Sequence, residues 1–217
     1  MGKRNLGLEL CRAVIEPAPA KVARLLSEGA DPNVVGDKRY PRMADRTPLW
    51  LAVNDAGLEA STTWTDFHTA LREVFSDVSK RDYSATRKKF VEIARQLIKA
   101  GADLEKRSFG GTPLRIAVHH RDEQLVKLLL DKGANPNAET FSIISKLVKR
   151  NSHTPAYYNT VLHEAVEKNA ISIGEALLAA GADPTRKDHE GRTSLEIARE
   201  KGHTEILKLL EKANSSK

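Results

Sequence analysis

Seven histidines and one cysteine are the side chains in this sequence whose types are best suited to binding a metal or acting as a nucleophile. His119 and His120 are adjacent, so on a helix they would point about 100° apart and chelate one ion poorly. His163 is followed by Glu164, but position 167 holds glutamate where a zinc protease motif needs a second histidine. The remaining histidines lie in separate segments, without cysteines or carboxylates at ligand spacing. The sequence therefore predicts no metal site.

The sequence also lacks the motifs of the common catalytic and phosphate-binding sites. It has neither a glycine-rich phosphate loop nor a Gly-x-Ser-x-Gly turn. Cys11 falls in an expected N-terminal helix, where we do not expect a nucleophile. A lone cysteine cannot form an intramolecular disulfide, which favours a reducing compartment. We expect a cytoplasmic protein that is not an enzyme and has no cofactor, although nuclear entry or secretion as an effector stays open.

The net charge of +6 arises from 35 Lys and Arg against 29 Asp and Glu. This excess favours acidic partners only weakly. Basic runs occur at 80–81, 87–89, 146–150 and 186–187, but few aromatic residues are interleaved with them to stack on bases. Nucleic-acid or other anionic-ligand binding through the basic insertions is therefore the alternative to the main hypothesis. No apolar run approaches the roughly 20 residues of a membrane span, and the N-terminus lacks a signal-peptide core.

Two short phrases recur along the chain. One is Gly-Ala followed by Asp or Asn, and it starts at Gly29, Gly101, Gly133 and Gly181. The other starts with Thr and has Leu two residues later, and it occurs at Thr47, Thr112, Thr160 and Thr193. Successive Thr phrases are 33 residues apart between 160 and 193, and successive Gly phrases are 32 apart between 101 and 133. A fixed period of this length predicts a repeat protein.

Each phrase has a local physical reason. Threonine is a good helix N-cap, and proline is tolerated at the first helical position, so Thr47-Pro48 and Thr112-Pro113 should each begin a helix. A second helix follows, with apolar residues at spacings of three and four, and it ends at a glycine that can adopt the left-handed conformation. Its apolar stripe is formed by Ile93, Leu97 and Ile98 in one repeat and by Val126, Leu129 and Leu130 in the next. The repeat therefore predicts pairs of antiparallel helices.

The combined pattern resembles the ankyrin repeat. The resemblance implies an all-α solenoid of stacked helix–turn–helix units with projecting hairpin edges, in one domain over 1–217. Its repeats would run over 6–34, 44–104, 107–139, 155–187 and 188–213. The family's role implies a protein-binding adaptor or scaffold that is monomeric on its own.

One repeat is interrupted by an insertion, and a second insertion separates two repeats. A regular repeat has 21 residues from Thr to the next Gly, whereas Thr47 to Gly101 spans 54, which leaves 33 extra residues at about 56–88. Ser84 is a candidate cap for a lengthened second helix there. A second insertion covers 140–154, and its apolar residues, starting with Phe141, predict a short helix. Insertions of this kind often form the binding face of a repeat protein, so specificity could be set at 56–88. They could also simply cover the stack.

The resemblance also implies where a partner would bind. In ankyrin proteins the recognition surface is the concave side, formed by hairpin tips and first helices. Transferring that surface to this sequence, with weight on the aromatic and Arg side chains that dominate interfaces, selects Arg46, Trp50, Phe109, His119, His120, Tyr157, Lys168 and Arg192. A core position is the favoured alternative for Trp50, and Phe109 and Tyr157 could equally be ordinary packed or solvated residues.

Overall fold

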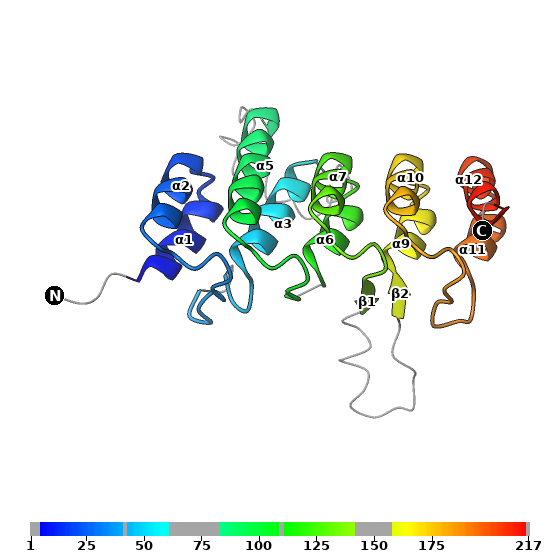
Figure 1. Cartoon of the computed structure of the whole chain (residues 1–217), viewed down its shortest axis with the longest axis horizontal. Helices are drawn as coiled ribbons and strands as arrows, with labels where there is room; N and C mark the ends of the chain where they lie inside the picture. Colours follow the sequence, from blue (N-terminus) through cyan, green and yellow to red (C-terminus); the bar gives the residue numbers. More distant parts are fainter. Residues whose placement is uncertain (1–4, 41–42, 61–82, 109–110, 142–157, 216–217) are drawn as a thin grey trace, which may run out of the picture. The chain divides into compact units, whose positions relative to one another are not determined.

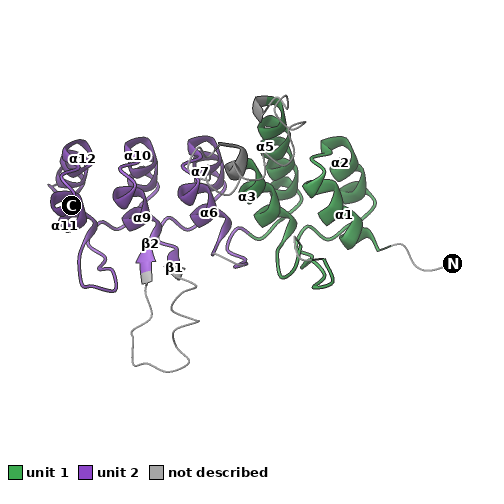
Figure 2. Cartoon of the chain, turned by 180° about the vertical axis from the view of Figure 1, so that it is seen from behind, with its two compact units in different colours: residues 1–103 green, residues 104–217 purple. Residues whose placement is uncertain are grey.

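The computed structural model describes residues 5–40, 43–60, 83–108, 111–141 and 158–215. These residues form two compact units, Met1–Asp103 and Leu104–Lys217 (Figure 2). Each unit is a stack of helix pairs. The predicted all-α repeat fold is confirmed, whereas the assignment of the whole chain to one domain stays a prediction.

Unit 1 contains two helix pairs. The first pair is α1 (Leu6–Ile15) with α2 (Pro19–Ser27), and the second is α3 (Pro48–Ala60) with α5 (Tyr83–Lys99). The pairs stack because α1 packs against α3 and α2 packs against α5 (Figure 1). The first helices, α1 and α3, therefore form one layer of the unit, and the second helices, α2 and α5, form the other.

Unit 2 repeats this arrangement. Its first helices are α6 (Pro113–His119), α9 (Val161–Glu167) and α11 (Ser194–Glu200), and its second helices are α7 (Glu123–Asp131), α10 (Ile171–Ala179) and α12 (Thr204–Ser215). Within the unit α9 lies between α6 and α11, and α10 lies between α7 and α12. Strands β1 (Glu139–Phe141) and β2 (Tyr158–Thr160) pair antiparallel just before α9.

The first helices of unit 2 begin at the threonines of the recurring phrase, as predicted for Thr112. Thr112, Thr160 and Thr193 have extended backbones, and each hydroxyl accepts a hydrogen bond from an amide three residues later. These bonds satisfy amides that the helix itself leaves without an acceptor. At Thr193 the backbone amide in turn donates a hydrogen bond to the Glu196 carboxylate, which completes a capping box.

The second helices end at the glycines of the Gly-Ala phrase. Gly133 and Gly181 have φ values of 91° and 92°, which a side chain would strain. Four residues after Gly133, the Asn137 amide group donates to the Gly181 carbonyl and accepts from the Asp183 amide at 3.1 and 2.8 Å. The phrase thus closes one helix and also connects the turns of successive repeats.

Asn33 makes the same bridge in unit 1, to the Gly101 carbonyl and the Asp103 amide. At the equivalent place in the next repeat, Glu105 accepts from the Asn135 amide at 2.8 Å. The recurring phrases by themselves do not predict these links between repeats, which form only in the folded chain.

The stripes predicted for the second helices face the core. Ile93, Leu97, Val126 and Leu129 are buried, whereas Ile98 and Leu130 are half-buried. Cys11 is buried in α1, and burial raises the pKa of its thiol to about 11. A thiol that is buried and protonated at neutral pH is a poor nucleophile.

The long insertion begins and ends as extensions of the two helices that flank it. Helix α3 has 13 residues and α5 has 17, whereas α6 has seven and α7 has nine. The lengthened second helix is therefore confirmed. It begins at Tyr83, so Ser84 lies inside its first turn and is not its cap. Residues 61–82 of the insertion lie outside the described residues.

The second insertion was predicted to form a short helix, but its described residues do not. Phe141 lies in β1, paired with Tyr158, and so is not part of a helix. Strand pairing extends the hairpin that precedes α9, so Phe141 is held in extended backbone despite its apolar spacing. Residues 142–157 lie outside the described residues.

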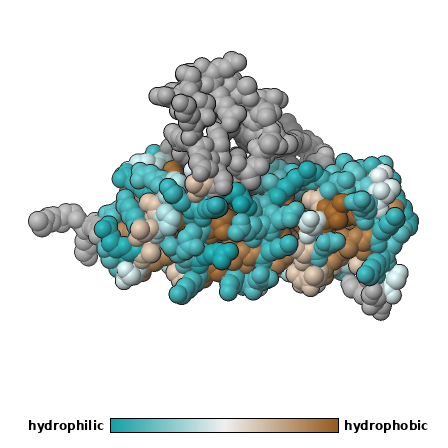
Figure 3. Space-filling model, turned by 90° about the horizontal axis from the view of Figure 1, so that it is seen from above, coloured by the Kyte–Doolittle hydropathy of each residue, from teal (hydrophilic) through white to brown (hydrophobic). Residues whose placement is uncertain are grey.

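No helix of the described residues is long and apolar enough to cross a membrane. Figure 3 shows hydrophilic residues over much of the surface visible in that view, with hydrophobic residues between them.

Candidate functional site

A buried carboxylate lies between the first helices α6 and α9 of unit 2. The two oxygens of Glu164 in α9 face basic side chains of α6: Oε1 is 2.7 Å from His119 Nδ1, and Oε2 is 3.3 Å from Arg115 Nε. Lys168, one turn after Glu164, places Nζ 3.9 Å from Oε1 and also donates to the His119 carbonyl at 2.9 Å. We call Arg115, His119, Glu164 and Lys168 the Glu164 cluster.

Glu164 stands at a position that is apolar in the three other repeats that begin with a threonine. Counting four residues from each N-cap threonine gives Leu51, Ile116 and Ile197 in those repeats, and all three are buried. Glu164 is also buried. A charged group in this place must give up hydration that costs several kcal/mol by order of magnitude. A charged residue at a position that is usually apolar is expected where a protein needs that charge for its function.

The cluster keeps the carboxylate ionised. Burial by itself raises the pKa of Glu164, but the hydrogen bond from His119 and the charges of Arg115 and Lys168 together lower it further, so the net pKa is below the usual value. Burial also lowers the pKa of Lys168, and this effect exceeds the opposing attraction of Glu164. At neutral pH the carboxylate is therefore negative and holds its three basic neighbours in place.

His120 follows His119 at the end of α6 and is buried. The pKa of His120 is lowered to about 4, chiefly by burial. His119 and Lys168 also lower this pKa, whereas the negative charges of Glu164 and Asp122 raise it. The ring of His119 meets that of His120 edge-on at 5.4 Å between centroids. His120 is therefore a neutral, packed side chain at neutral pH that supports the exposed ring of His119.

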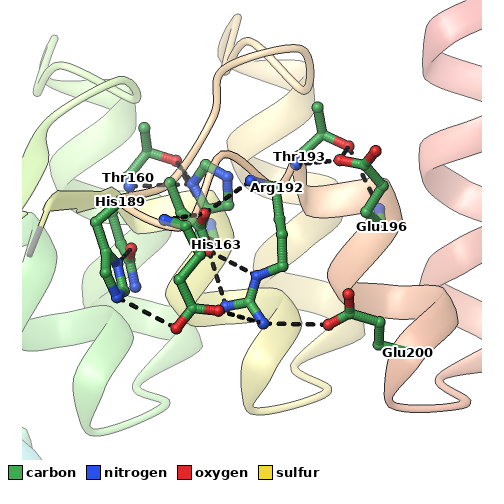
Figure 4. Close-up of polar contacts among 10 residues, drawn as sticks. Thr160, His163, His189, Arg192, Thr193, Glu196 and Glu200 are labelled. Atoms are coloured by element: carbon green, nitrogen blue, oxygen red, sulfur yellow. Dashed lines mark hydrogen bonds and ion pairs between the residues drawn. The ribbon is translucent and has the colours of Figure 1, made fainter.

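Arg192 lies in a different part of unit 2, in the hairpin before α11 (Figure 4). Its guanidinium contacts Asp188 at 2.9 Å, Glu190 at 2.9 Å and Glu200 at 3.1 Å. Asp188 is buried and also accepts the amides of Glu190 and Arg192. Arg192 therefore fixes the hairpin onto the end of α11, and any contact with a partner would use a guanidinium already engaged by three carboxylates.

His163 has a structural role at the start of α9. Its Nδ1 accepts a hydrogen bond from the Thr160 amide at 3.1 Å, and the Thr160 hydroxyl lies 2.8 Å away (Figure 4). The ring is buried, and burial lowers its pKa. His163 is thus part of a helix cap.

Trp50 and Arg46 lie together in unit 1, at the start of α3. The guanidinium of Arg46 sits over the Trp50 ring, 5.0 Å from its centroid, in a cation–π contact. Only 3 % of Trp50 is exposed. Trp50 is therefore a core residue, which was the favoured alternative, and only the half-buried Arg46 presents surface to a partner.

The other two predicted contact residues, Phe109 and Tyr157, lie outside the described residues. Of the remaining six, the structure brings His119, His120 and Lys168 together in unit 2 and pairs Arg46 with Trp50 in unit 1. Arg192 belongs to the separate hairpin network. Glu164 and Arg115 were not predicted. The signal that could have found Glu164 is a carboxylate at a position that holds leucine or isoleucine in three other repeats.

Among the described residues, no group of three or more His, Cys, Asp and Glu side chains is arranged to hold a metal ion. The chemistry that the Glu164 cluster offers is hydrogen bonding and charge. His119 and Lys168 keep 44 % and 29 % of their side chains exposed beside the carboxylate that orients them. Oriented polar side chains at a surface lose less conformational freedom when a partner binds.

Comparison with known proteins agrees with the repeat pattern. A family model described as ankyrin repeats (3 copies) matches residues 83–140 and 138–217, which is more than half of the chain. Mouse cyclin-dependent kinase 4 inhibitor B is 31% identical over 124 residues, which cover 57% of this chain and 84% of the inhibitor. A putative ankyrin repeat protein of fowlpox virus is 32% identical over 153 residues, which cover 58% of this chain and 45% of the viral protein.

Larger proteins carry a similar stretch. The BRCA1-associated RING domain protein 1 of Caenorhabditis elegans is 32% identical over 118 residues, which cover 54% of this chain. The chain spans only 14% of that protein, and 18% of a probable E3 ubiquitin-protein ligase of rice. The likeness to these two is therefore a likeness to one part of each.

Proposed function

Because the chain belongs to the ankyrin-repeat family, whose repeats are protein–protein interaction modules, we propose that it is a non-catalytic protein that binds a partner through the hairpins and first helices of its repeats. The observation that carries this proposal is the Glu164 cluster. A carboxylate is kept at a position that is apolar in three other repeats, and it orients the exposed His119 and the half-buried Lys168 on the first-helix surface of unit 2.

We also propose that the protein acts as a cytoplasmic adaptor or scaffold and is monomeric on its own. The insertion at 56–88 contributes to its specificity. The candidate contact residues are Arg46, His119, Lys168 and Arg192, with Phe109 and Tyr157 from the predicted hairpin tips. We give His119 and Lys168 the most weight, because both side chains reach the surface and are oriented by the buried Glu164 carboxylate.

Affinity purification with tagged full-length chain, followed by quantitative mass spectrometry, tests this proposal. The bait pair is wild type and His119→Ala/Lys168→Ala, which removes these two side chains. The matched control is Lys127→Ala/Lys208→Ala, which changes two exposed residues of the second helices α7 and α12.

We expect the first double variant to lose a set of proteins that the control retains. Circular dichroism should show that both variants stay folded. Identical protein sets from all three baits would refute the assignment of binding to the Glu164 cluster.

A further inference from the structure

Helix α5 is more basic than the second helices of unit 2. It carries Arg87, Lys88, Lys89, Arg95 and Lys99 against a single acidic residue, Glu92, so its 17 residues have a charge of +4. In unit 2, α7 has one lysine against two acidic residues, α10 has only Glu175, and α12 has two lysines against two glutamates. The charge of α5 therefore exceeds that of every second helix of unit 2, whereas in unit 1 α2 is also basic, with Lys21 and Arg24 and no acidic residue.

The basic residues of α5 lie on its exposed side. Phe90, Ile93 and Leu97 are buried, whereas Lys88, Lys89, Arg95 and Lys99 are exposed. Positions 88, 92, 95 and 99 follow the spacing of one helical face. From Lys88 to Lys99 this face extends about 16 Å, at the helical rise of about 1.5 Å per residue. We call Lys88, Lys89, Arg95 and Lys99 the α5 basic face.

The charges of this face are not neutralised within the described part of the chain. None of its four cations takes part in an ion pair there, whereas Arg24, Arg192 and Arg199 elsewhere each contact a carboxylate. Glu92, the acidic residue among them, accepts a hydrogen bond from Gln96. Like charges four residues apart, such as Arg95 and Lys99, repel each other and weaken a helix slightly. An acidic partner would relieve this repulsion.

The position of Glu92 indicates the kind of partner. It lies between Lys88 and Arg95 on the same helical face. A nucleic-acid backbone or an anionic membrane presents negative charge continuously, and would therefore set phosphates against the Glu92 carboxylate. A protein segment can place a different residue at that point. The pattern basic, acidic, basic, basic thus fits a peptide better than a uniform polyanion.

We propose that the α5 basic face binds an acidic helical segment of a partner protein. In the antiparallel arrangement, three glutamates at i, i+4 and i+11 of the segment face Lys99, Arg95 and Lys88, and a basic residue at i+7 faces Glu92. This surface lies on a second helix and is therefore separate from the first-helix surface of the proposed function. It gives the protein a second binding surface.

Fluorescence anisotropy with labelled synthetic peptides of about 20 residues tests the proposal on the full chain. The matched peptide has the spacing above in an alanine–glutamine host, and the scrambled peptide has the same composition with its charges spread around the helix. Lys88→Gln/Arg95→Gln/Lys99→Gln removes three charges of the face. Lys127→Gln/Lys201→Gln/Lys208→Gln removes three exposed charges elsewhere and is the control.

We expect the matched peptide to bind more tightly than the scrambled one. The first triple variant should weaken its binding about tenfold, because each exposed charge pair contributes a few-fold, and the control should leave it nearly unchanged. Glu92→Lys should weaken binding of the matched peptide as well. Equal binding of the two peptides, or equal loss in both triple variants, would overturn the proposal.

Duplex DNA and phosphatidylserine vesicles are assayed in parallel. Binding of either that is tighter than that of the matched peptide, and is strengthened by Glu92→Lys, would show that the face serves a polyanion and would refute an acidic protein segment. Because the residues tested lie on α5, this result is independent of whether His119 and Lys168 bind a partner.

Discussion

Replacing Glu164 with leucine should make the protein more stable. The position holds leucine or isoleucine in three other repeats, so the backbone around it suits an apolar side chain. Exchange of a whole buried ion pair for apolar residues is typically neutral or stabilising by about 1–4 kcal/mol, since the dehydration of the charges is removed. Removal of one partner alone typically costs about 3–5 kcal/mol, but only where the remaining charge stays buried. Here the change removes the carboxylate and leaves its basic neighbours, which limits the gain. His119 and Lys168, 44 % and 29 % exposed, can return to water, whereas Arg115 at 18 % is rehydrated less easily. We expect a net gain of about 1 kcal/mol, at the lower end of that range.

Two further variants separate the contributions at this position. Glu164→Ala removes the carboxylate and also leaves a cavity, so it should be about 2 kcal/mol or more less stable than Glu164→Leu. Glu164→Gln keeps the shape but loses the charge and turns an amide donor toward basic groups. It should fall below wild type by about 1–3 kcal/mol.

Equilibrium unfolding in urea, followed by far-ultraviolet circular dichroism, gives these free energies. The denaturant slope must stay constant for the comparison to hold. If Glu164→Leu proves less stable than wild type by about 1 kcal/mol or more, the ion cluster is itself a net source of stability. The cluster would then be explained without any role in binding.

The pKa of His120 is about 4 in the folded protein and 6.5 in the unfolded chain. Between these pH values the unfolded state therefore binds one more proton at this residue than the folded state. Stability from this residue is therefore complete above pH 6.5 and is lost as the pH falls toward 4, by up to roughly 3 kcal/mol. Unfolding free energies measured across that range should depend less on pH in His120→Gln, and an unchanged slope would count against this origin. Asn137→Ala should lower the free energy of unfolding by about 1–2 kcal/mol, because it removes the two hydrogen bonds to Gly181 and Asp183. Asn214→Ala, at an exposed position near the end of α12, is its control, and equal effects of the two would contradict the bridge. Cys11, buried and with its pKa raised to about 11, should not react with a thiol reagent at neutral pH until the protein is unfolded. Rapid labelling of the native chain would show that α1 opens readily.

The sequence by itself determined the features that depend on a few neighbouring residues. Helix starts at Thr112, Thr160 and Thr193 were predictable because a cap is made within three residues. The helix ends at Gly133 and Gly181 were predictable because only a glycine adopts their backbone conformation without strain. The regular return of these signals then specified the repeat and its family.

The tertiary structure decided what depends on residues brought together from different repeats. Neither Glu164 nor His119 is unusual in its own helix, and only the stacking of α9 on α6 gives the carboxylate its basic neighbours. Asn137 could be read as a turn residue until its bridge to Gly181 was visible. Phe141 has helical spacing but lies in a strand, because a pairing partner 17 residues later competes with local preference. Contacts of this kind have no local signature, since their energy is gained only when the chain is folded.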